Sequence, residues 1–227
     1  MTWKYYPVCL DIKGKNCLVV GGGAVGARKV SALISCGAIV KAVSLKFSHA
    51  FEKLESKGIE LVEREFRTED LDGMFLVIGA TDNTEVNKTI SRDAEKRNML
   101  CNIADFPEAC NFILPAIVRR GDLMITASTS GKSPAFAKKL KKDLENEFGE
   151  EYADFLFLMG KIRKRLLCQD HAPEAHKPLF EEIISKGLLT MIADKNYTEI
   201  DNLLTSVFGR GYSYKNLVSG EKHGDCR

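Results

Sequence analysis

The stretch LVVGGGAVGARKVSALISCGA, residues 18–38, decides the fold. A short apolar run at 16–20 enters the glycines, and a helical pattern follows them. Gly21, Gly23 and Gly26 fit the spacing G-x-G-x-x-G. Between a strand and a helix, the first glycine permits a tight turn, the second lets the backbone approach a pyrophosphate, and the third allows close helix–strand packing. The stretch therefore predicts a dinucleotide-binding loop, with the phosphates at the N-terminus of the helix.

The end of the second strand normally identifies the dinucleotide, because an Asp or Glu there bonds the ribose hydroxyls of NAD. Here the strand pattern over 39–44 ends in Ser44-Leu45-Lys46, without an acid. Ser44 could bond a hydroxyl, and Lys46 could tolerate a 2′-phosphate or be a plain solvated lysine. These residues leave the choice between NAD and NADP open.

Strand and helix patterns alternate through the first hundred residues. Further strand patterns cover 59–65, 75–81 and 100–103, and further helical patterns cover 47–57 and 84–97. This alternation predicts an α/β fold with a parallel sheet that helices cover on both faces. Because ligands bind beyond the carboxyl ends of such strands, Thr81 should lie near the cofactor. Thr81-Asp82 could also cap the helix that begins near residue 84.

The alternation of strand and helix patterns ends after residue 110. Two strand patterns, 111–118 and 123–128, are joined by a predicted hairpin turn, and Ser133-Pro134 begins a helix. Residues 149–208 are helical, with breaks near 172–173 and at Gly187. The predicted domains are a nucleotide-binding domain (1–110), a hairpin-plus-helix module (111–148), a helical domain (149–208) and a polar tail (209–227).

Composition argues against a membrane-spanning protein and against a nucleic-acid-binding protein. The chain has 227 residues, a net charge of +2 and no apolar run long enough to span a bilayer. Its seven cysteines show no C-x-x-C pair, which predicts reduced thiols and a cytoplasmic protein. Residues 119–142 hold seven basic side chains and one acid. Four of them are interpreted as a solvated helix face rather than a nucleic-acid surface, whereas Arg119, Arg120 and Lys132 could attract an anionic ligand.

Asp105 directly follows the last strand pattern of the nucleotide-binding domain. By the rule for strand ends it should face the cofactor crevice, where a carboxylate can accept a proton as hydride leaves the substrate. An Asp two residues before Pro107 could equally be a turn former.

Four motifs in register carry a resemblance to a known family. The segments CLVVGGGAVGARK, ATDN, CNIADFPEACNFILPA and STSGKSPAFAKKL, within residues 5–148, resemble the precorrin-2 dehydrogenase family. That family includes stand-alone enzymes and the corresponding portion of siroheme synthase. The resemblance implies an N-terminal Rossmann domain, a central dimerisation module, a C-terminal helical domain and a homodimer. It also implies that the chain oxidises precorrin-2, a small anionic tetrapyrrole, to sirohydrochlorin with NAD.

The resemblance also assigns roles to particular residues. Asp105 falls on the family's catalytic aspartate. The dinucleotide contacts fall on Ala24, Val25, Leu45 and Lys46, and the tetrapyrrole site lies near the loop Ser128, Thr129 and Ser130. The family pattern likewise lacks the acid after the second strand.

Two alternatives stay open at this point. Some family members also insert ferrous iron into sirohydrochlorin, although no His/Cys spacing here predicts a metal site. A regulatory domain that senses NAD is the alternative of another class, and a carboxylate at Asp105 with basic residues nearby disfavours it. No membrane or nucleic-acid partner is expected.

Overall fold

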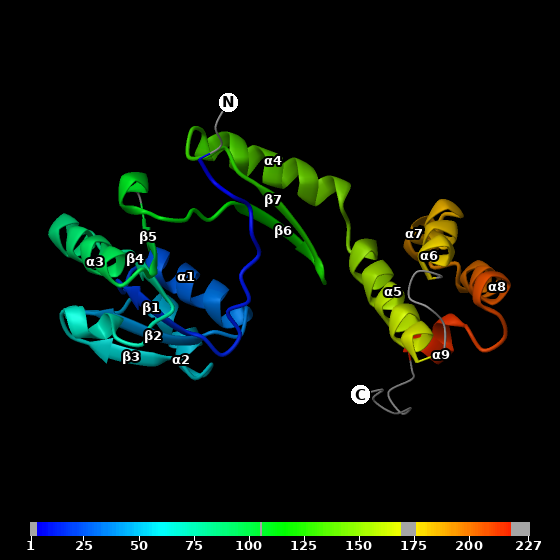
Figure 1. Ribbon diagram of the computed structural model, residues 1–227, viewed down its shortest axis with the longest axis horizontal. Helices are drawn as coiled ribbons and strands as arrows, with labels where there is room; N and C mark the ends of the chain where they lie inside the picture. Colours follow the sequence, from blue (N-terminus) through cyan, green and yellow to red (C-terminus); the bar gives the residue numbers. More distant parts are fainter. Residues whose placement is uncertain (1–3, 105, 169–175, 219–227) are drawn as a thin grey trace. The chain divides into compact units, whose positions relative to one another are not determined.

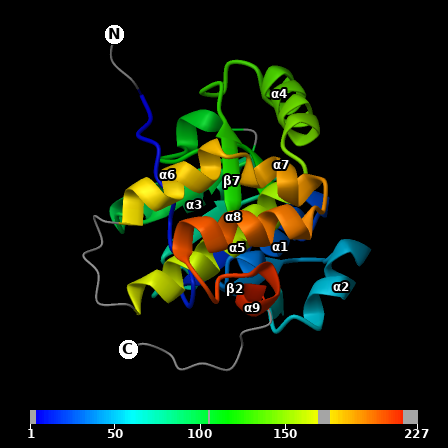
Figure 2. The ribbon, with the colours of Figure 1, turned by 90° about the vertical axis from the view of Figure 1, so that its right-hand side faces the viewer.

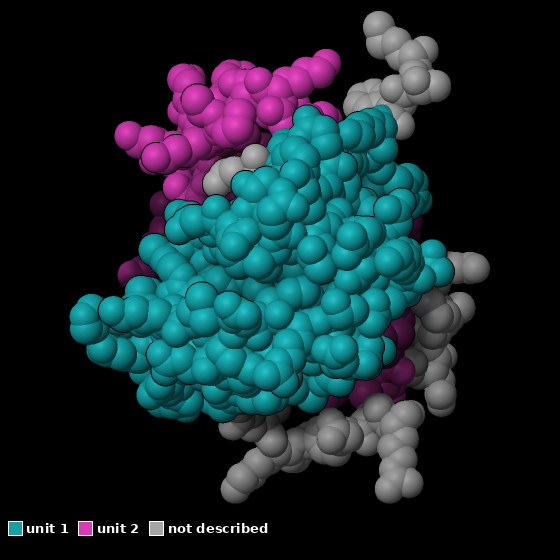
Figure 3. Space-filling model, turned by 90° about the vertical axis from the view of Figure 1, so that its left-hand side faces the viewer, with its two compact units in different colours: residues 1–114 teal, residues 115–227 magenta. Residues whose placement is uncertain are grey.

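The computed structural model describes residues 4–104, 106–168 and 176–218. The chain divides into two compact units, unit 1 with residues 1–114 and unit 2 with residues 115–227, which Figure 3 shows in teal and magenta. The finer domain boundaries at residues 110, 148 and 208 stay predictions. Within the described ranges, no helix combines the length and apolar character that crossing a membrane requires.

Unit 1 is built on a five-stranded, fully parallel sheet in the order β3-β2-β1-β4-β5. The predicted parallel sheet is thus confirmed, and the carboxyl ends of its strands share one edge. The strands are β1 (Asn16–Val20), β2 (Ile39–Ser44), β3 (Glu60–Glu63), β4 (Leu76–Gly79) and β5 (Leu100–Ile103).

Helices cover both faces of this sheet (Figure 1). On one face, Val19 of β1 packs with Val30 of α1 (Ala24–Ser35), with η1 (His49–Phe51) and with α2 (Glu52–Glu55). On the other face, Leu18 packs with Ile90 of α3 (Thr84–Lys96) and with η2 (Thr68–Leu71). Because both faces are buried, β1 is a continuous apolar run rather than an alternating one.

The helix predicted over 47–57 is present only in part and is less regular than predicted. The chain instead forms the short η1 and the four-residue α2, and Gly58 follows with φ of +75°. The N–H of Ser48 donates to the carbonyl of Gly22 at 2.9 Å, and Phe51 is fully buried against the α1 side of the sheet. These long-range contacts hold the segment close to the glycine loop, so a regular helix cannot begin at residue 47.

The strand predicted over 111–118 is also displaced. The first strand of the hairpin, β6, spans Ala116–Arg120 and pairs antiparallel with β7 (Leu123–Ala127). Arg119 and Arg120, expected in the turn, lie in β6, so that the turn is Gly121-Asp122. The reason is that Asn111 bonds to β5 instead, as described below.

Unit 2 combines this hairpin with helices (Figure 2). Helix α4 (Pro134–Glu147) packs on β6 and β7. Leu158, Ile162, Leu188, Ile200 and Leu204 lie at the centre of a separate helical core. Gly187, with φ of +81°, marks the predicted helix break, whereas the break near 172–173 lies outside the described residues. The core is formed by α5 (Glu151–Leu167), α6 (His176–Ser185), α7 (Leu188–Ala193), α8 (Tyr197–Phe208) and α9 (Tyr214–Val218).

Five cysteines of the described part of the chain carry free thiols, as predicted: Cys9, Cys17, Cys36, Cys101 and Cys110. Burial raises the pKa of Cys17 to about 11 and, with a smaller contribution from Cys110, that of Cys101 to about 12. Cys168, at the end of α5, is disulfide-bonded, which the cysteine spacing did not predict.

A buried carboxylate ties β2 to η2. The Asp70 side chain is 3% exposed and accepts two hydrogen bonds from Arg64, at 2.7 and 2.6 Å. It also accepts a bond from the N–H of Arg67 at 2.9 Å, and the Lys41 ammonium lies 3.2 Å away. Burial alone would raise the pKa of Asp70, but the bonds from Arg64, Arg67 and Lys41 outweigh it and hold the pKa well below its usual range.

Asp70→Asn is expected to lower the free energy of unfolding by about 3 kcal/mol at neutral pH, because it leaves the partly buried Arg64 without its partner. Since the folded-state pKa is depressed, the contribution of Asp70 is complete above its unfolded pKa of about 3.9 and is lost as the pH falls below that value. Urea denaturation at pH 7 and pH 3 should therefore show a gap that narrows in acid. Asp72→Asn, at an exposed pair with Arg97, is the control with about 0.5 kcal/mol expected. Equal stability of wild type and Asp70→Asn at pH 7 would contradict this role.

Candidate active site

The glycine loop turns from β1 into α1 at the carboxyl edge of the sheet. Gly21 has φ of +126°, and a Cβ there would overlap the carbonyl oxygen of Ala80. A Cβ on Gly26 would overlap the carbonyl oxygen of Gly21. The tight turn and the close helix–strand packing predicted from the spacing are thus both present, and the protein's own backbone requires these two glycines.

Gly23 differs from the other glycines of the loop. It has an ordinary φ of −79°, and a Cβ placed on it would meet no described protein atom within 4 Å. It is exposed, together with Ala24, at the N-terminus of α1. Neither packing nor backbone conformation demands glycine here, and the space beside Gly23 is open.

The N-terminus of α1 has the properties of an anion site. Gly23 is its N-cap and supplies no side-chain cap, and the first turn carries no acid. The first intrahelical bond runs from Ala27 N–H to the Gly23 carbonyl at 3.0 Å, so the N–H groups of Ala24, Val25 and Gly26 precede it. Together with the open space at Gly23, these donors fit a pyrophosphate.

The segment after β2 crosses over the glycine loop. A Cβ on Gly22 would overlap the carbonyl oxygen of Lys46. The G-x-G-x-x-G spacing does not predict this requirement, although three consecutive glycines are a signal for it. Ser44 Oγ donates to that same carbonyl at 2.9 Å, so its hydrogen is engaged within the segment. Leu45 is 67% exposed and Lys46 is exposed as well.

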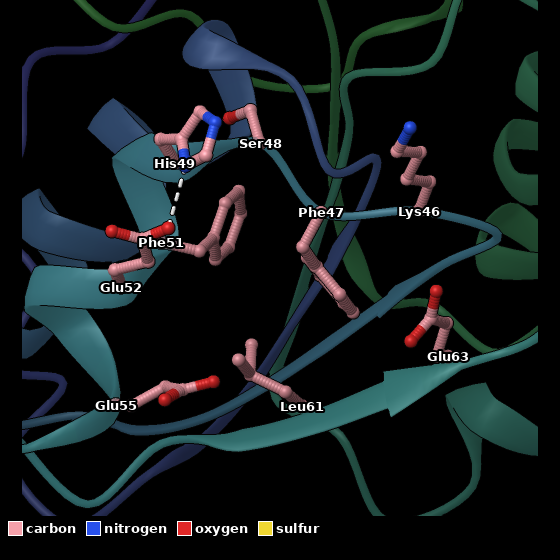
Figure 4. A pocket seen from close by; sticks show the side chains of 9 residues that line it. All are labelled: Lys46, Phe47, Ser48, His49, Phe51, Glu52, Glu55, Leu61 and Glu63. Carbon is pink, nitrogen blue, oxygen red and sulfur yellow. Dashed lines mark hydrogen bonds and ion pairs between the residues drawn. The ribbon is translucent and has the colours of Figure 1, made fainter.

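A cavity of about 490 Å³ lies on the other side of this segment, next to α2 and β3 (Figure 4). Its lining includes three carboxylates, Glu52, Glu55 and Glu63, and His49 pairs with Glu52 at 2.6 Å. Lys46 is drawn with its ammonium turned away from the other lining side chains. Since carboxylates repel phosphate, this cavity does not fit the charged part of a dinucleotide.

The end of β4 lies beside the glycine loop. Thr81 Oγ1 lies 3.0 Å from Asn87 Oδ1 and 3.1 Å from the Asn83 carbonyl, and Asn87 Nδ2 donates to the Thr81 carbonyl at 2.9 Å. The side chain that caps α3 is Asn83, which accepts from the N–H groups of residues 85 and 86. Capping by Thr81-Asp82 was therefore the wrong expectation, since Asn83 stands directly before the first helical residue.

Asp105, the predicted base, lies outside the described residues. The residue before it continues the ladder of the sheet, because the N–H of Ala104 donates to the Gly79 carbonyl at 2.8 Å. The chain thus reaches residue 104 at the same carboxyl edge as the glycine loop and the end of β4.

The predicted substrate residues belong to unit 2. The hydroxyls of Ser128 and Thr129 accept hydrogen bonds from the N–H groups of Ser130 and Ser133, each at 3.1 Å. Ser130 has φ of +53°, an uncommon value that this folded-back loop imposes. Lys132 is exposed beside it.

The two arginines of β6 have different surroundings. Arg119 is exposed. The Arg120 side chain is only 16% exposed; it donates to the Glu145 carbonyl at 2.8 Å and pairs with Glu150 at 3.4 Å. These contacts connect the hairpin to the junction of α4 and α5, which favours a structural role for Arg120 over substrate binding.

Across residues 4–104, 106–168 and 176–218, no three His, Cys, Asp or Glu side chains gather in a group that could hold a metal ion. The cofactor candidates, Gly21 to Gly26, Ser44 to Lys46 and Thr81, share the carboxyl edge of one sheet. The substrate candidates share the hairpin and the loop before α4.

Two family patterns match the chain in succession. Residues 8–116 match the family described as putative NAD(P)-binding, and residues 120–147 match the central region of sirohaem biosynthesis proteins. Among solved structures, SirC, a precorrin-2 dehydrogenase, superposes with a TM-score of 0.75 and 28% identity over 89% of this chain and 98% of its own.

Two curated relatives are named siroheme synthase. The protein from Vesicomyosocius okutanii is 35% identical over 80% of this chain, and that from Citrobacter koseri is 36% identical over 94%. The chain spans 39% and 47% of their respective lengths. It is therefore similar to less than half of each.

Proposed function

We propose that this chain, a member of the precorrin-2 dehydrogenase family to which a portion of the siroheme synthases also belongs, oxidises precorrin-2 to sirohydrochlorin with NAD. The observation that supports this most is the match to SirC over nearly the whole of that protein, hairpin and helices included. The nucleotide-binding pattern and the sirohaem central pattern also follow one another in this single chain.

The reaction removes two hydrogens from the substrate: one leaves as a hydride and the other as a proton. NAD, when bound, supplies the hydride acceptor and becomes NADH. The residues around Gly23 would hold its pyrophosphate, with the N–H groups of Ala24, Val25 and Gly26 as donors. Leu45 and Lys46 are exposed after β2, where the ribose passes in a fold of this kind, and Thr81 follows β4.

Asp105 is proposed as the base that takes the proton. Its carboxylate accepts the substrate proton as the hydride departs, so that no positive charge accumulates on the macrocycle. Ala104, bonded to Gly79, brings the chain to the carboxyl edge of the sheet immediately before this residue. A domain that only senses NAD has no need of such a carboxylate.

The substrate carries acetate and propionate arms and is strongly anionic. Because Ser128 and Thr129 accept backbone hydrogen bonds, each keeps its own O–H hydrogen to donate toward a carboxylate. Exposed Arg119 and Lys132 add positive charge, each exposed ion pair contributing about 0.2–1 kcal/mol. We assign the loop 128–132 and Arg119 to the carboxylates, and Arg120 to the structure of the module.

We further propose a homodimer formed through the hairpin and α4. None of the 14 residues of α4 is buried in the single chain, and Phe136 is 50% exposed. A two-stranded sheet is also marginally stable by itself, and Met124 of β7 is 39% exposed. A second copy would cover these apolar side chains.

Sedimentation equilibrium should give twice the chain mass for the wild type and a monomer for Phe136→Asp, because the aspartate would place a charge in the interface. Lys138→Asp, on the opposite side of α4, is the matched control and should stay dimeric. A wild type that sediments as a monomer at micromolar concentration would refute the proposed dimer.

We place the enzyme in the cytoplasm. The five free thiols of the described residues support a reducing compartment, and Cys168 is the exception to that pattern. Fractionation of cells that express the chain tests this location directly.

The test of the proposed activity is a turnover assay in which protein, precorrin-2 and NAD are mixed without oxygen. NADH and the sirohydrochlorin spectrum should appear together, at a rate proportional to the protein concentration. Binding of NAD without any NADH would instead support the sensor.

A further inference from the structure

Strand β5 lies at the edge of the sheet, with β4 on one side and no strand on the other within the described residues. Alternate residues of an edge strand turn their N–H and C=O groups outward, where they need other partners. In β5 and just before it these residues are Met99, Cys101 and Ile103. The chain itself returns to cover them after the excursion of residues 104–109, which includes η3 (Pro107–Ala109).

Asn111 forms hydrogen bonds to the edge of β5 that a neighbouring strand would otherwise form. Its Oδ1 accepts from the N–H of Cys101 at 2.8 Å, and its Nδ2 donates to the Met99 carbonyl at 2.7 Å. Its backbone N–H donates to the Cys101 carbonyl at 3.1 Å. A single residue thus satisfies three outward groups of the edge.

Cys110 forms hydrogen bonds that connect the two ends of the 104–109 loop. Its Sγ accepts from the N–H of Ile103 at 3.1 Å and lies 3.3 Å from the carbonyl oxygens of Ile103 and Phe106, to either of which the thiol can donate. The side chain of Cys110, where the chain returns to β5, therefore bonds to Ile103, where the chain leaves β5.

Two further bonds hold the returning chain. Asn102, which is 8% exposed, donates from Nδ2 to the Phe112 carbonyl at 3.0 Å. Ser91 of α3 donates from Oγ to the Ala109 carbonyl at 2.9 Å. Both ends of the 104–109 loop are thus fixed to the sheet and to α3, independently of any ligand.

We infer that Asn111 and Cys110 are positioning residues: their side chains seal the edge of β5 and anchor residues 104 and 106–109, which flank the proposed base Asp105 in the sequence. The inference rests on the proposed function, because it acts through the proposed base. A base must stand within hydrogen-bond reach of the proton that it removes, and a displacement of about 1 Å can cost 10²-fold in rate.

Asn111→Ala should remove the two side-chain hydrogen bonds of Asn111, to Cys101 and to Met99, and leave the glycine loop unchanged. Hydrogen exchange at the Cys101 amide should become at least about tenfold faster. The turnover number kcat should fall about 10- to 100-fold because residues 104 and 106–109 lose their anchor to β5. The Kd for NAD should stay within about twofold, which a general loosening of the sheet would not allow. Asn16→Ala, which removes an amide-to-backbone bond to Gly73 elsewhere in unit 1, is the matched control and should keep wild-type kcat.

Cys110 provides a second, milder test. Cys110→Ala removes the link between Ile103 and Phe106 and should lower kcat about 5- to 20-fold, whereas Cys110→Ser keeps a donor and an acceptor and should restore most of the loss. Rescue by serine distinguishes the hydrogen-bonded role from simple filling of space.

Wild-type kcat in a folded Asn111→Ala protein would overturn the inference. So would a loss of kcat matched by an equal loss of NAD affinity, which would indicate general loosening of the sheet. If the wild type does not oxidise precorrin-2, the proposed function and the positioning role fall together. If the wild type oxidises precorrin-2 and the variants have the same kcat, only the positioning role is refuted.

Discussion

Asp105→Asn should lower kcat for precorrin-2 oxidation about 10²- to 10⁴-fold, because an amide cannot take up the proton that leaves with the hydride. The amide has nearly the size and shape of the carboxylate, so the fold should persist and the Kd for NAD should stay close to that of the wild type. Steady-state kinetics give kcat, and quenching of protein fluorescence by NAD gives the Kd.

Glu108→Gln is the matched control for this substitution. Glu108 is an exposed carboxylate in the same 104–109 loop, within η3, and its neutralisation should leave kcat within about twofold of the wild type. A folded Asp105→Asn protein that turns over precorrin-2 at the wild-type rate would remove the proposed base.

Gly23→Ala should weaken NAD binding at least about tenfold, which corresponds to about 1.4 kcal/mol, while changing Tm by less than about 3 °C. The expectation follows from the open space at this position: the new methyl group meets no described protein atom within 4 Å, and φ of −79° suits alanine. The methyl group would instead occupy the space that the pyrophosphate needs.

Gly22→Ala is the contrasting variant in the same loop. Its methyl group would overlap the Lys46 carbonyl, so the cost should appear mainly in stability, at about 1–3 kcal/mol. Calorimetry and NAD titration of both variants separate the two effects. Unchanged NAD affinity in Gly23→Ala would show that no phosphate approaches this glycine.

The parts of unit 1 that could be predicted are those with local signals. The strand before Gly21 and the helix after Gly23 both follow from neighbouring residues, and the structure contains them. The helix over 47–57 is shorter than predicted because a distant contact, from Ser48 to Gly22, decides how that segment begins.

The same distinction applies to the candidate site. Gly23 could be singled out from spacing alone. That Arg120 faces Glu145 and Glu150, and that Asn111 completes the edge of β5, depends on residues far apart in the chain. A strand-like run that begins with Asn, a residue seldom found in strand interiors, was the one local signal against a strand starting at 111.

The central claim is that this chain couples the oxidation of precorrin-2 to the reduction of NAD. The most direct measurement is the ratio of NADH to sirohydrochlorin formed by the wild-type protein without oxygen, with Asp105→Asn run in parallel. We expect one NADH for each sirohydrochlorin, and almost none of either with the variant over the same time. Sirohydrochlorin formed without NADH, or at the same rate with wild type and variant, would contradict it.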